Sequence, residues 1–202
     1  MEEKIDYFQH KSKTYSKDSK RVRNVHNIAN GILKNITYSK DMHLMDFGSG
    51  TGLLTIQIAP YVKKITGVDM SPSMNATLLE NKNQVVCDLD ILQIDIVKED
   101  IAQTFDGIIS SMTLHHVENI EALFLKFYGV LNKNGTIALS DLYTEDGSFH
   151  TENTGVFHLG FEEEFICECA KKAGFKDIVC EQVSIAKKPH GEYPIFLLTA
   201  RK

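Results

Sequence analysis

The stretch LMDFGSGTGLLTIQIA, residues 44–59, places three glycines at alternate positions between two apolar runs. The first run predicts a buried strand and the second predicts a helix, so Gly48, Gly50 and Gly52 fall in a strand-to-helix turn. Glycine lets the backbone approach a ligand closely, and a helix N-terminus offers free N–H groups. The stretch therefore predicts a nucleotide site.

The spacing of the glycines argues against several classes of nucleotide. A dinucleotide fingerprint needs its third glycine at position 53, where this chain has Leu53, which disfavours NAD and FAD. A phosphate-binding P-loop is excluded because no Gly-Lys-Ser/Thr follows. Asp46, two residues before Gly48, would repel a pyrophosphate and would suit a cation such as an amino or sulfonium group.

Working outward, apolar runs that read as strands alternate with segments of helical spacing, which predicts a parallel sheet covered on both faces. The last two strands, 176–187 and 193–202, have only five residues between them, so they must form an antiparallel hairpin. The other strands are expected at 43–48, 65–70, 89–96, 105–112 and 136–142. Helices are expected at 19–36, 51–62, 71–82, 117–131 and 161–175.

Two further carboxylates stand at predicted strand ends. Asp69 ends the second strand, where an acid can accept both hydroxyls of a ribose. Asp95 ends the third strand, where it could accept an adenine amino group while Ile96 packs on the ring. Together with Asp46 they line the carboxyl edge of the sheet, where ligands of open α/β sheets bind.

The ordered motifs MDFGSGTG, ITGVDMSPSM, ILQIDI, FDGIISSMTLHHVEN and LNKNGTIALSDL resemble those of class I S-adenosylmethionine-dependent methyltransferases. The resemblance covers roughly residues 20–202 and implies a three-layer, Rossmann-like, seven-stranded sheet of order 3-2-1-4-5-7-6 with its last strand antiparallel. It implies S-adenosylmethionine as cofactor and S-adenosylhomocysteine as product. The residues it implies for cofactor binding are Asp46, Gly48, Ser49, Gly50, Gly52, Leu53, Asp69, Met70, Asp95, Ile96, Ser111 and Met112.

Methyl transfer requires an aligned nucleophile and the exclusion of water, and it requires a base only when the nucleophile carries a proton of high pKa. One candidate group is His115 and His116, after the fourth strand, of which we select His116. The other candidates lie in or after the fifth strand, on a linking segment long enough to suggest function: Asp141, His150 and His158. These three could instead hold a metal, but their spacing fits no known pattern and we predict none.

Residues 1–40 are expected to form a helix and a lid, ahead of a cofactor-binding core at 41–202, within a single domain. Tyr15 is expected to touch the site from this lid and completes the set of candidate catalytic residues. The same segment is basic and could contact phosphate or RNA, although a solvated helix face is the simpler interpretation.

The formal net charge is −5, which does not favour a nucleic-acid binder, and no run reaches membrane-spanning length. Four scattered cysteines without a Cys-x-x-Cys predict reduced thiols and a cytoplasmic protein. We expect a small-molecule acceptor and leave the oligomeric state open. The alternatives are an RNA or protein methyltransferase, disfavoured because SSMT replaces an Asn-Pro-Pro-Tyr type motif, and a cofactor-binding module without catalysis.

Overall fold

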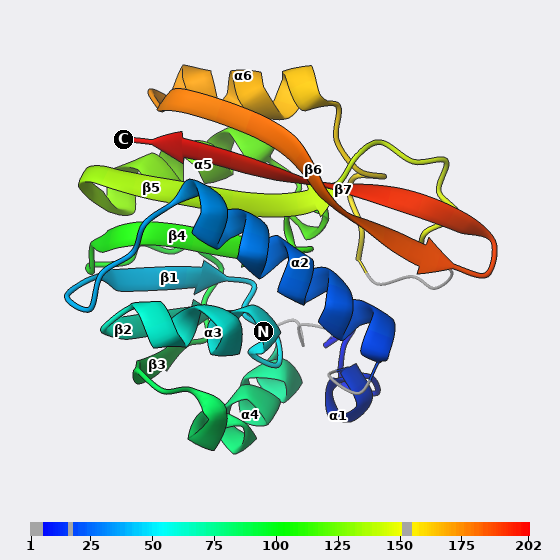
Figure 1. The fold of residues 1–202 in the computed structure, drawn as a ribbon, viewed down its shortest axis with the longest axis horizontal. Coiled ribbons are helices and arrows are strands. Elements are labelled where there is room, and N and C mark those ends of the chain that lie inside the picture. The colour runs from blue at the N-terminus through cyan, green and yellow to red at the C-terminus, as the bar shows by residue number, and fades with distance from the viewer. Residues whose placement is uncertain (1–5, 16–17, 151–154) are drawn as a thin grey trace.

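The computed structural model describes residues 6–15, 18–150 and 155–202, whose strands form one seven-stranded sheet of order β3-β2-β1-β4-β5-β7-β6 (Figure 1). Strands β1 to β5 pair in parallel, and β7 runs antiparallel to both β5 and β6. The predicted strand order and antiparallel last strand are therefore confirmed. The strands are β1 His43–Phe47, β2 Lys64–Val68, β3 Asp88–Leu92, β4 Phe105–Ser111, β5 Leu131–Leu142, β6 Lys176–Lys188 and β7 Gly191–Arg201.

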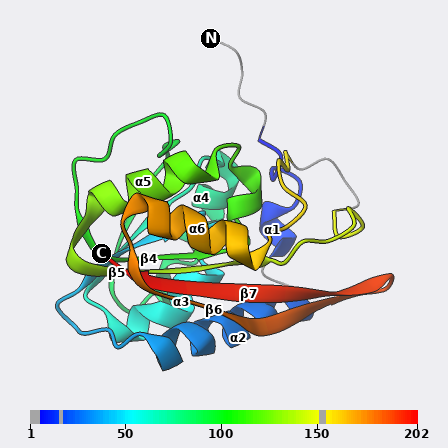
Figure 2. The ribbon, with the colours of Figure 1, turned by 90° about the horizontal axis from the view of Figure 1, so that it is seen from above.

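Helices cover both faces of the sheet, which gives three layers (Figure 2). Apolar side chains of α5 and α6 pack on one face of the central strands in a cluster that includes Met45 and Ile108. Those of α2 and α3 pack on the other face around Leu44 and Ile109. The α-helices are α1 Ser12–Tyr15, α2 Ser19–Asn35, α3 Leu53–Ile58, α4 Pro72–Glu80, α5 Ile120–Val130 and α6 Glu163–Ala173; 3-10 turns lie at η1 Ala59–Tyr61, η2 Lys82–Gln84 and η3 Leu114–His116.

Helix caps account for where several of these helices begin and end. Ser71 Oγ accepts a hydrogen bond of 3.2 Å from Met74 N, with Pro72 at the first helical position of α4, as predicted. Asn119 Oδ1 accepts from Ala122 N over 2.9 Å, so α5 begins at Ile120, three residues later than predicted. At the C-terminal end of α6, Gly174 adopts φ 104° and ends the helix.

The third strand is shorter than predicted. β2 ends at Val68, which pairs with Leu92, so the backbone after Leu92 has no neighbouring strand to bond. Asp95 therefore does not end a strand, as we had predicted, but lies in a turn three residues beyond β3. Its carboxylate accepts from Val97 N over 3.2 Å, which closes that turn.

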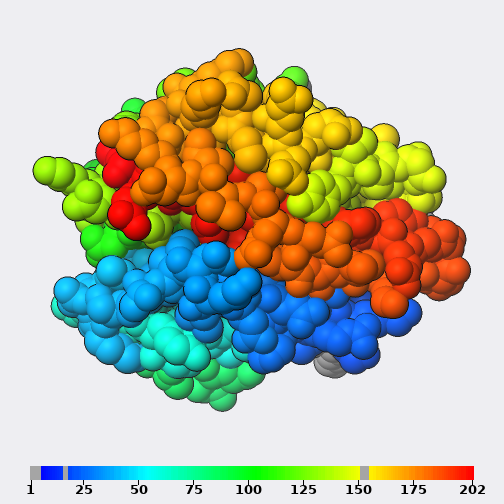
Figure 3. Space-filling model, turned by 45° about the horizontal axis from the view of Figure 1, so that its top comes forward, coloured from blue at the N-terminus to red at the C-terminus, as the bar shows by residue number. Residues whose placement is uncertain are grey.

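The long hairpin of β6 and β7 extends beyond the sheet, and only two residues separate its strands rather than the predicted five. Helix α2 packs along β6, where Asn27 Nδ2 donates to Ser184 Oγ over 3.2 Å. Figure 3 shows the blue surface of α2 lying against the orange surface of β6. No helix of the described residues is both long and apolar enough to cross a lipid bilayer.

Candidate functional site

The glycine turn after β1 is held open by its backbone conformation. Gly48, Gly50 and Gly52 have φ values of 68°, 53° and 88°, in the left-handed region that favours glycine. Gly50 N donates to Asp69 Oδ2 over 2.9 Å, and Ser71 N donates to Asp69 Oδ1 over 2.8 Å. The end of β2 thus fixes the turn, and burial raises the pKa of Asp69 despite these bonds.

This turn opens onto a cavity of about 870 Å³ at the carboxyl edge of the sheet. The size is that of an ordinary small-molecule or cofactor site. Among the residues expected to bind a cofactor, Gly52 does not line the cavity, because it lies under Leu78 as the N-cap of α3. Those that line it are Asp46, Gly48, Ser49, Gly50, Leu53, Asp69, Met70, Asp95, Ile96, Ser111 and Met112.

Asp46 is buried beneath the glycine turn, with only 1% of its surface exposed. Its Oδ2 accepts a hydrogen bond of 2.5 Å from Thr55 Oγ1 on α3. Burial raises its pKa to about 7, so the carboxyl group is close to half ionised at neutral pH. A cation placed beside it would favour the ionised form.

Buried hydroxyl groups at the cavity wall lack protein partners. Within the described residues, Ser49 Oγ and Ser111 Oγ are buried and have no hydrogen-bond partner. Met112, the next residue, has φ 59°, an uncommon value for a side chain larger than glycine. Unpaired polar atoms and a strained backbone at one place are typical of a ligand site.

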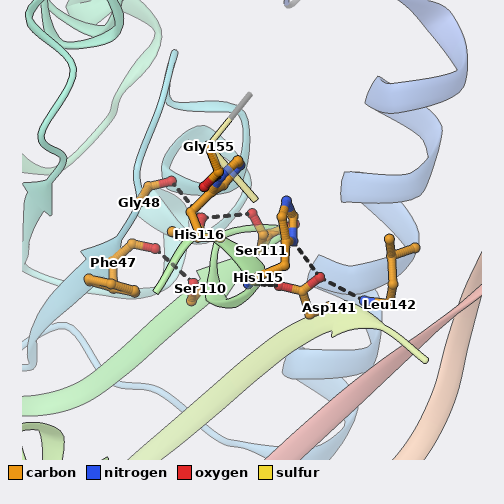
Figure 4. A network of polar contacts seen from close by, with 10 residues as sticks. Phe47, Gly48, Ser110, Ser111, His115, His116, Asp141, Leu142 and Gly155 are labelled. Atoms are coloured by element: carbon orange, nitrogen blue, oxygen red, sulfur yellow. Dashed lines mark hydrogen bonds and ion pairs between the residues drawn. The ribbon is translucent and has the colours of Figure 1, made fainter. Parts of the chain in front are cut away.

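A buried histidine–aspartate pair lies at the wall of this cavity. His115 on η3 donates from Nδ1 to Oδ1 of Asp141, at the end of β5, over 2.7 Å, and its backbone N–H donates to Oδ2 over 3.1 Å (Figure 4). Burial raises the pKa of Asp141, but the positive charge that His115 carries when protonated, together with the hydrogen bonds that His115 donates, holds that pKa below its usual value. His115 is 2% exposed and lines the cavity, whereas Asp141 does not line it.

His116 and His150 lie against this pair. The ring centroids of His115 and His116 are 4.3 Å apart, and those of His115 and His150 are 4.9 Å apart. Burial, then the neighbouring charge of His115, lowers the pKa of both His116 and His150 to about 4. His116 Nδ1 donates to the Gly155 carbonyl over 3.2 Å, whereas the buried His150 Nε2 has no partner among the described residues.

His158 does not join this cluster. Its Nε2 donates to the Val117 carbonyl over 2.9 Å, and it does not line the cavity. The alternative metal set of Asp141, His150 and His158 is therefore not brought together. Among the residues that the structure describes, no group of three or more His, Cys, Asp or Glu side chains could hold a metal ion.

The N-terminal segment of residues 6–15 forms another wall. Asp6 accepts from Ser71 Oγ over 2.8 Å and from Ser73 N over 3.1 Å, which joins the segment to the start of α4. Phe8 meets His116 edge to face, with ring centroids 5.5 Å apart. Tyr15 lines the cavity as predicted, with the Arg21 guanidinium 3.8 Å above its ring, and burial raises its pKa.

Sequence reasoning missed three parts of this site. It named His116 as a candidate catalytic residue and left out its neighbour His115, although both line the cavity. It also missed Arg21 and Lys188, two cations of the cavity wall. The Lys188 ammonium donates to the Phe149 carbonyl and lies 3.8 Å from the centre of the Phe149 ring. Burial lowers the pKa of Lys188, and the charge of Arg21 lowers it further.

The sequence of this chain is similar to those of known methyltransferases. The family model described as "Methyltransferase domain" matches residues 45–139. A protein of Schizosaccharomyces pombe named as an uncharacterized methyltransferase is 26% identical over 162 residues, which is 72% of this chain and 57% of that protein. The chain thus spans little more than half the length of this relative.

Solved structures share the fold at low identity. Phosphoethanolamine N-methyltransferase 2 of Haemonchus contortus, in complex with phosphomonomethylethanolamine and S-adenosylhomocysteine, superposes with a TM-score of 0.74 at 19% identity; the match covers 98% of this chain and 59% of that one. Magnesium protoporphyrin IX methyltransferase from Synechocystis, with bound S-adenosylhomocysteine, gives a TM-score of 0.72 at 15% identity, covering 98% and 97%.

Proposed function

The chain carries a class I S-adenosylmethionine-dependent methyltransferase domain, and from this premise we propose that the protein transfers a methyl group from S-adenosylmethionine to a small-molecule acceptor. The observation that carries the proposal is the glycine turn tied to Asp69 at the mouth of a cavity of about 870 Å³. We take the chain described here as a single domain, with residues 1–40 as its lid and helix and 41–202 as its core.

The residues at the glycine turn suit this cofactor. A side chain at Gly50 would meet nothing closer than the Gly48 carbonyl at 3.9 Å, so the turn leaves open space above it. Asp69 would hold the ribose, Asp46 would favour the cationic amino-acid end, and Ser49 and Ser111 offer unpaired hydroxyls. Asp95 and Ile96 would hold the adenine from the turn after β3. We propose the predicted set for cofactor binding without Gly52, whose role is to allow the turn.

When bound, the cofactor supplies a methyl group on a sulfonium, and the electrons of the broken carbon–sulfur bond stay on sulfur. The chain aligns the acceptor and keeps water away. Phe8 and Tyr15 close one side of the cavity, and Phe149 and His150 close another. We propose that the N-terminal segment, which was predicted as a lid, moves to admit the acceptor.

A small acceptor is supported by the size of the cavity, about 870 Å³, and by the names of the related structures. The related structures are named for phosphoethanolamine and magnesium protoporphyrin IX as the groups they methylate, both of them small molecules. We propose a cytoplasmic location, which is supported by four cysteines that are all unpaired.

Two measurements on the whole chain test the proposed function. Calorimetry should show binding of S-adenosylhomocysteine with one site, and S-adenosylmethionine labelled in its methyl group should transfer label to small amines, alcohols, phenols or carboxylates. Binding without transfer to this panel or to RNA and protein would favour a cofactor-binding module. Transfer to RNA or protein alone would favour the macromolecular alternative, and absence of binding would reject the proposal.

A further inference from the structure

The buried pair of His115 and Asp141 leaves one ring nitrogen of His115 without a described partner. A carboxylate only accepts hydrogen bonds, so the proton of the neutral His115 ring lies on Nδ1, facing Asp141. The other nitrogen, Nε2, then carries a lone pair and can accept a proton. His115 lines the cavity, so this nitrogen belongs to a ring that an acceptor can reach.

The hydrogen-bond donors around Asp141 favour the ionised form of its carboxyl group. Its Oδ1 also accepts from Leu142 N over 2.8 Å, so three N–H groups, two of them from His115, face the two oxygens. A buried carboxylate with several N–H donors and a partner ring stabilises an imidazolium formed beside it. His115 can therefore gain a proton without leaving the cluster.

The neighbouring histidines lack this support. His116 has a carbonyl as its partner and His150 has an unpaired Nε2, and neither contacts a carboxylate among the described residues. Both carry a pKa near 4, so at neutral pH they remain uncharged and do not compete for the proton. The charged groups around the cluster are Asp141 beneath His115 and Lys188 near His150, with Tyr15 close enough to sense the charge of Asp141.

We propose that His115, oriented by Asp141, is the general base that takes a proton from the methyl acceptor. This inference rests on the proposed methyl transfer. The proton on the acceptor's oxygen or nitrogen passes to His115 Nε2, and the electron pair it leaves behind forms the new bond to the methyl carbon. For a hydroxyl acceptor, the positive charge lost when the sulfonium becomes a thioether reappears on the imidazolium beside Asp141. For a protonated amine, the imidazolium takes over the charge of the ammonium, and the charge of the sulfonium passes to the methylated amine, so charge and atoms balance in both cases.

The acceptor class follows from the need for a base. A carboxylic acid is ionised at neutral pH, and a thiol, with a pKa of about 8.5, supplies some thiolate unaided, whereas an alcohol, a phenol or a protonated amine releases almost no proton there. The pair therefore assigns the acceptor to hydroxyl or amine compounds. Asp141, which does not line the cavity, is a positioning residue for His115.

The position of the proton can be measured without turnover. In the protein saturated with S-adenosylhomocysteine at pH 9, nitrogen-15 NMR should show His115 with a protonated Nδ1 and an unprotonated Nε2. Asp141→Asn, which keeps the shape but not the charge, should weaken this preference, whereas His26→Gln, an exposed histidine of α2 outside the cavity, should not. A proton on Nε2 in the wild type would overturn the proposal.

Measurements of turnover are the second test of this inference. His115→Gln should lower kcat by roughly 100-fold or more for hydroxyl and amine acceptors. Its affinity for S-adenosylhomocysteine should stay within about threefold of the wild type, which also shows that the variant folds. Its residual rate should rise with pH because the acceptor must then ionise unaided. His26→Gln should match the wild type.

The outcomes separate this inference from the proposed function. A wild-type rate in His115→Gln would overturn the base and leave the methyltransferase intact. Preferential methylation of thiols, with no rate on hydroxyl or amine acceptors, would also overturn it. Absence of transfer by the wild type would reject both.

Discussion

The backbone N–H of Gly50 donates a hydrogen bond of 2.9 Å to Oδ2 of Asp69, across 19 positions of the chain. The same carboxylate accepts from Ser71 N through its other oxygen, over 2.8 Å. One side chain therefore joins the turn after β1 to the end of β2 and to the start of α4. Its loss would disturb the shape of the glycine turn as well as the proposed ribose contact.

Asp69→Ala should weaken binding of S-adenosylhomocysteine by roughly 10- to 100-fold, because a charged hydrogen-bond acceptor is removed from two partners. Calorimetry measures this directly. Asp100→Ala is the matched control, since the Asp100 side chain is 94% exposed and lies outside the cavity. Equal affinity in Asp69→Ala and Asp100→Ala would reject the ribose role of Asp69.

Alanine at two glycines of the turn should have different effects. Both positions have positive φ, which costs about 1–2 kcal/mol for alanine. A Cβ at Gly48 would also fall 2.1 Å from Thr113 Oγ1, whereas one at Gly50 would meet nothing closer than the Gly48 carbonyl oxygen at 3.9 Å. Gly48→Ala should therefore lower Tm several degrees more than Gly50→Ala, as measured by calorimetric unfolding.

Gly50→Ala should affect ligand binding more than stability, because its added methyl group enters the open space at the turn. We expect a loss of affinity for S-adenosylhomocysteine while the protein remains folded at 25 °C. Undiminished affinity in Gly50→Ala would show that the ligand does not approach this part of the turn.

Asp46 should make the protein less stable as pH rises from about 4 to about 7. In this window the folded chain retains the Asp46 proton, since its pKa is about 7, while the unfolded chain has released it near pH 3.8. The unfolded state thus binds fewer protons, and the free energy of unfolding falls by up to roughly 4 kcal/mol before levelling above pH 7.

Asp46→Asn tests this linkage, because the amide oxygen can still accept from Thr55 Oγ1 and cannot ionise. Urea unfolding at pH 4.5, 6 and 7.5 should show the variant gaining stability relative to the wild type as pH rises. A constant difference between the two proteins across these values would contradict a raised pKa at Asp46.

Asp6→Asn should loosen the N-terminal wall of the cavity without unfolding the domain. The charge of Asp6 strengthens its bonds to Ser71 Oγ and Ser73 N, and these bonds lower its pKa although partial burial raises it. Trypsin should cleave after Lys11 or Lys13 several-fold faster in the variant, with Tm nearly unchanged. Asp88→Asn, on the exposed edge strand β3, is the control, and equal cleavage rates would rule out this anchoring.

The glycine turn and the antiparallel hairpin could be predicted because they depend on local signals, whereas the strand order was implied only by the resemblance to the methyltransferase family. Apolar periodicity, the spacing of Gly48, Gly50 and Gly52, and the short link between β6 and β7 each act over a few residues. The end of β3 could not be predicted, since it depends on where its neighbour β2 stops. Apolar spacing continued to Ile96 while the pairing partner ended at Val68.

The histidine–aspartate pair could not be predicted from the sequence for a different reason. His115 and Asp141 are 26 positions apart, and they meet because β4 and β5 pair with Ser111 opposite Ser140. That register places the turn after β4 over the end of β5. Two adjacent histidines carry no signal of which ring faces the aspartate, and the choice of His116 followed from that ambiguity.

The walls of the cavity come largely from the N-terminal segment, the segment after β5 and the β6–β7 hairpin, while the ends of β1, β2 and β4 form its floor. The N-terminal segment of residues 6–15 adds no residue to the two apolar clusters that hold the sheet together, whereas the hairpin adds Ala186 and Ile195. Substitutions in the N-terminal segment can therefore change which molecule fits without opening a gap in those clusters or in the floor. Of the three walls, this segment is the one through which the acceptor can be changed at the lowest cost to folding.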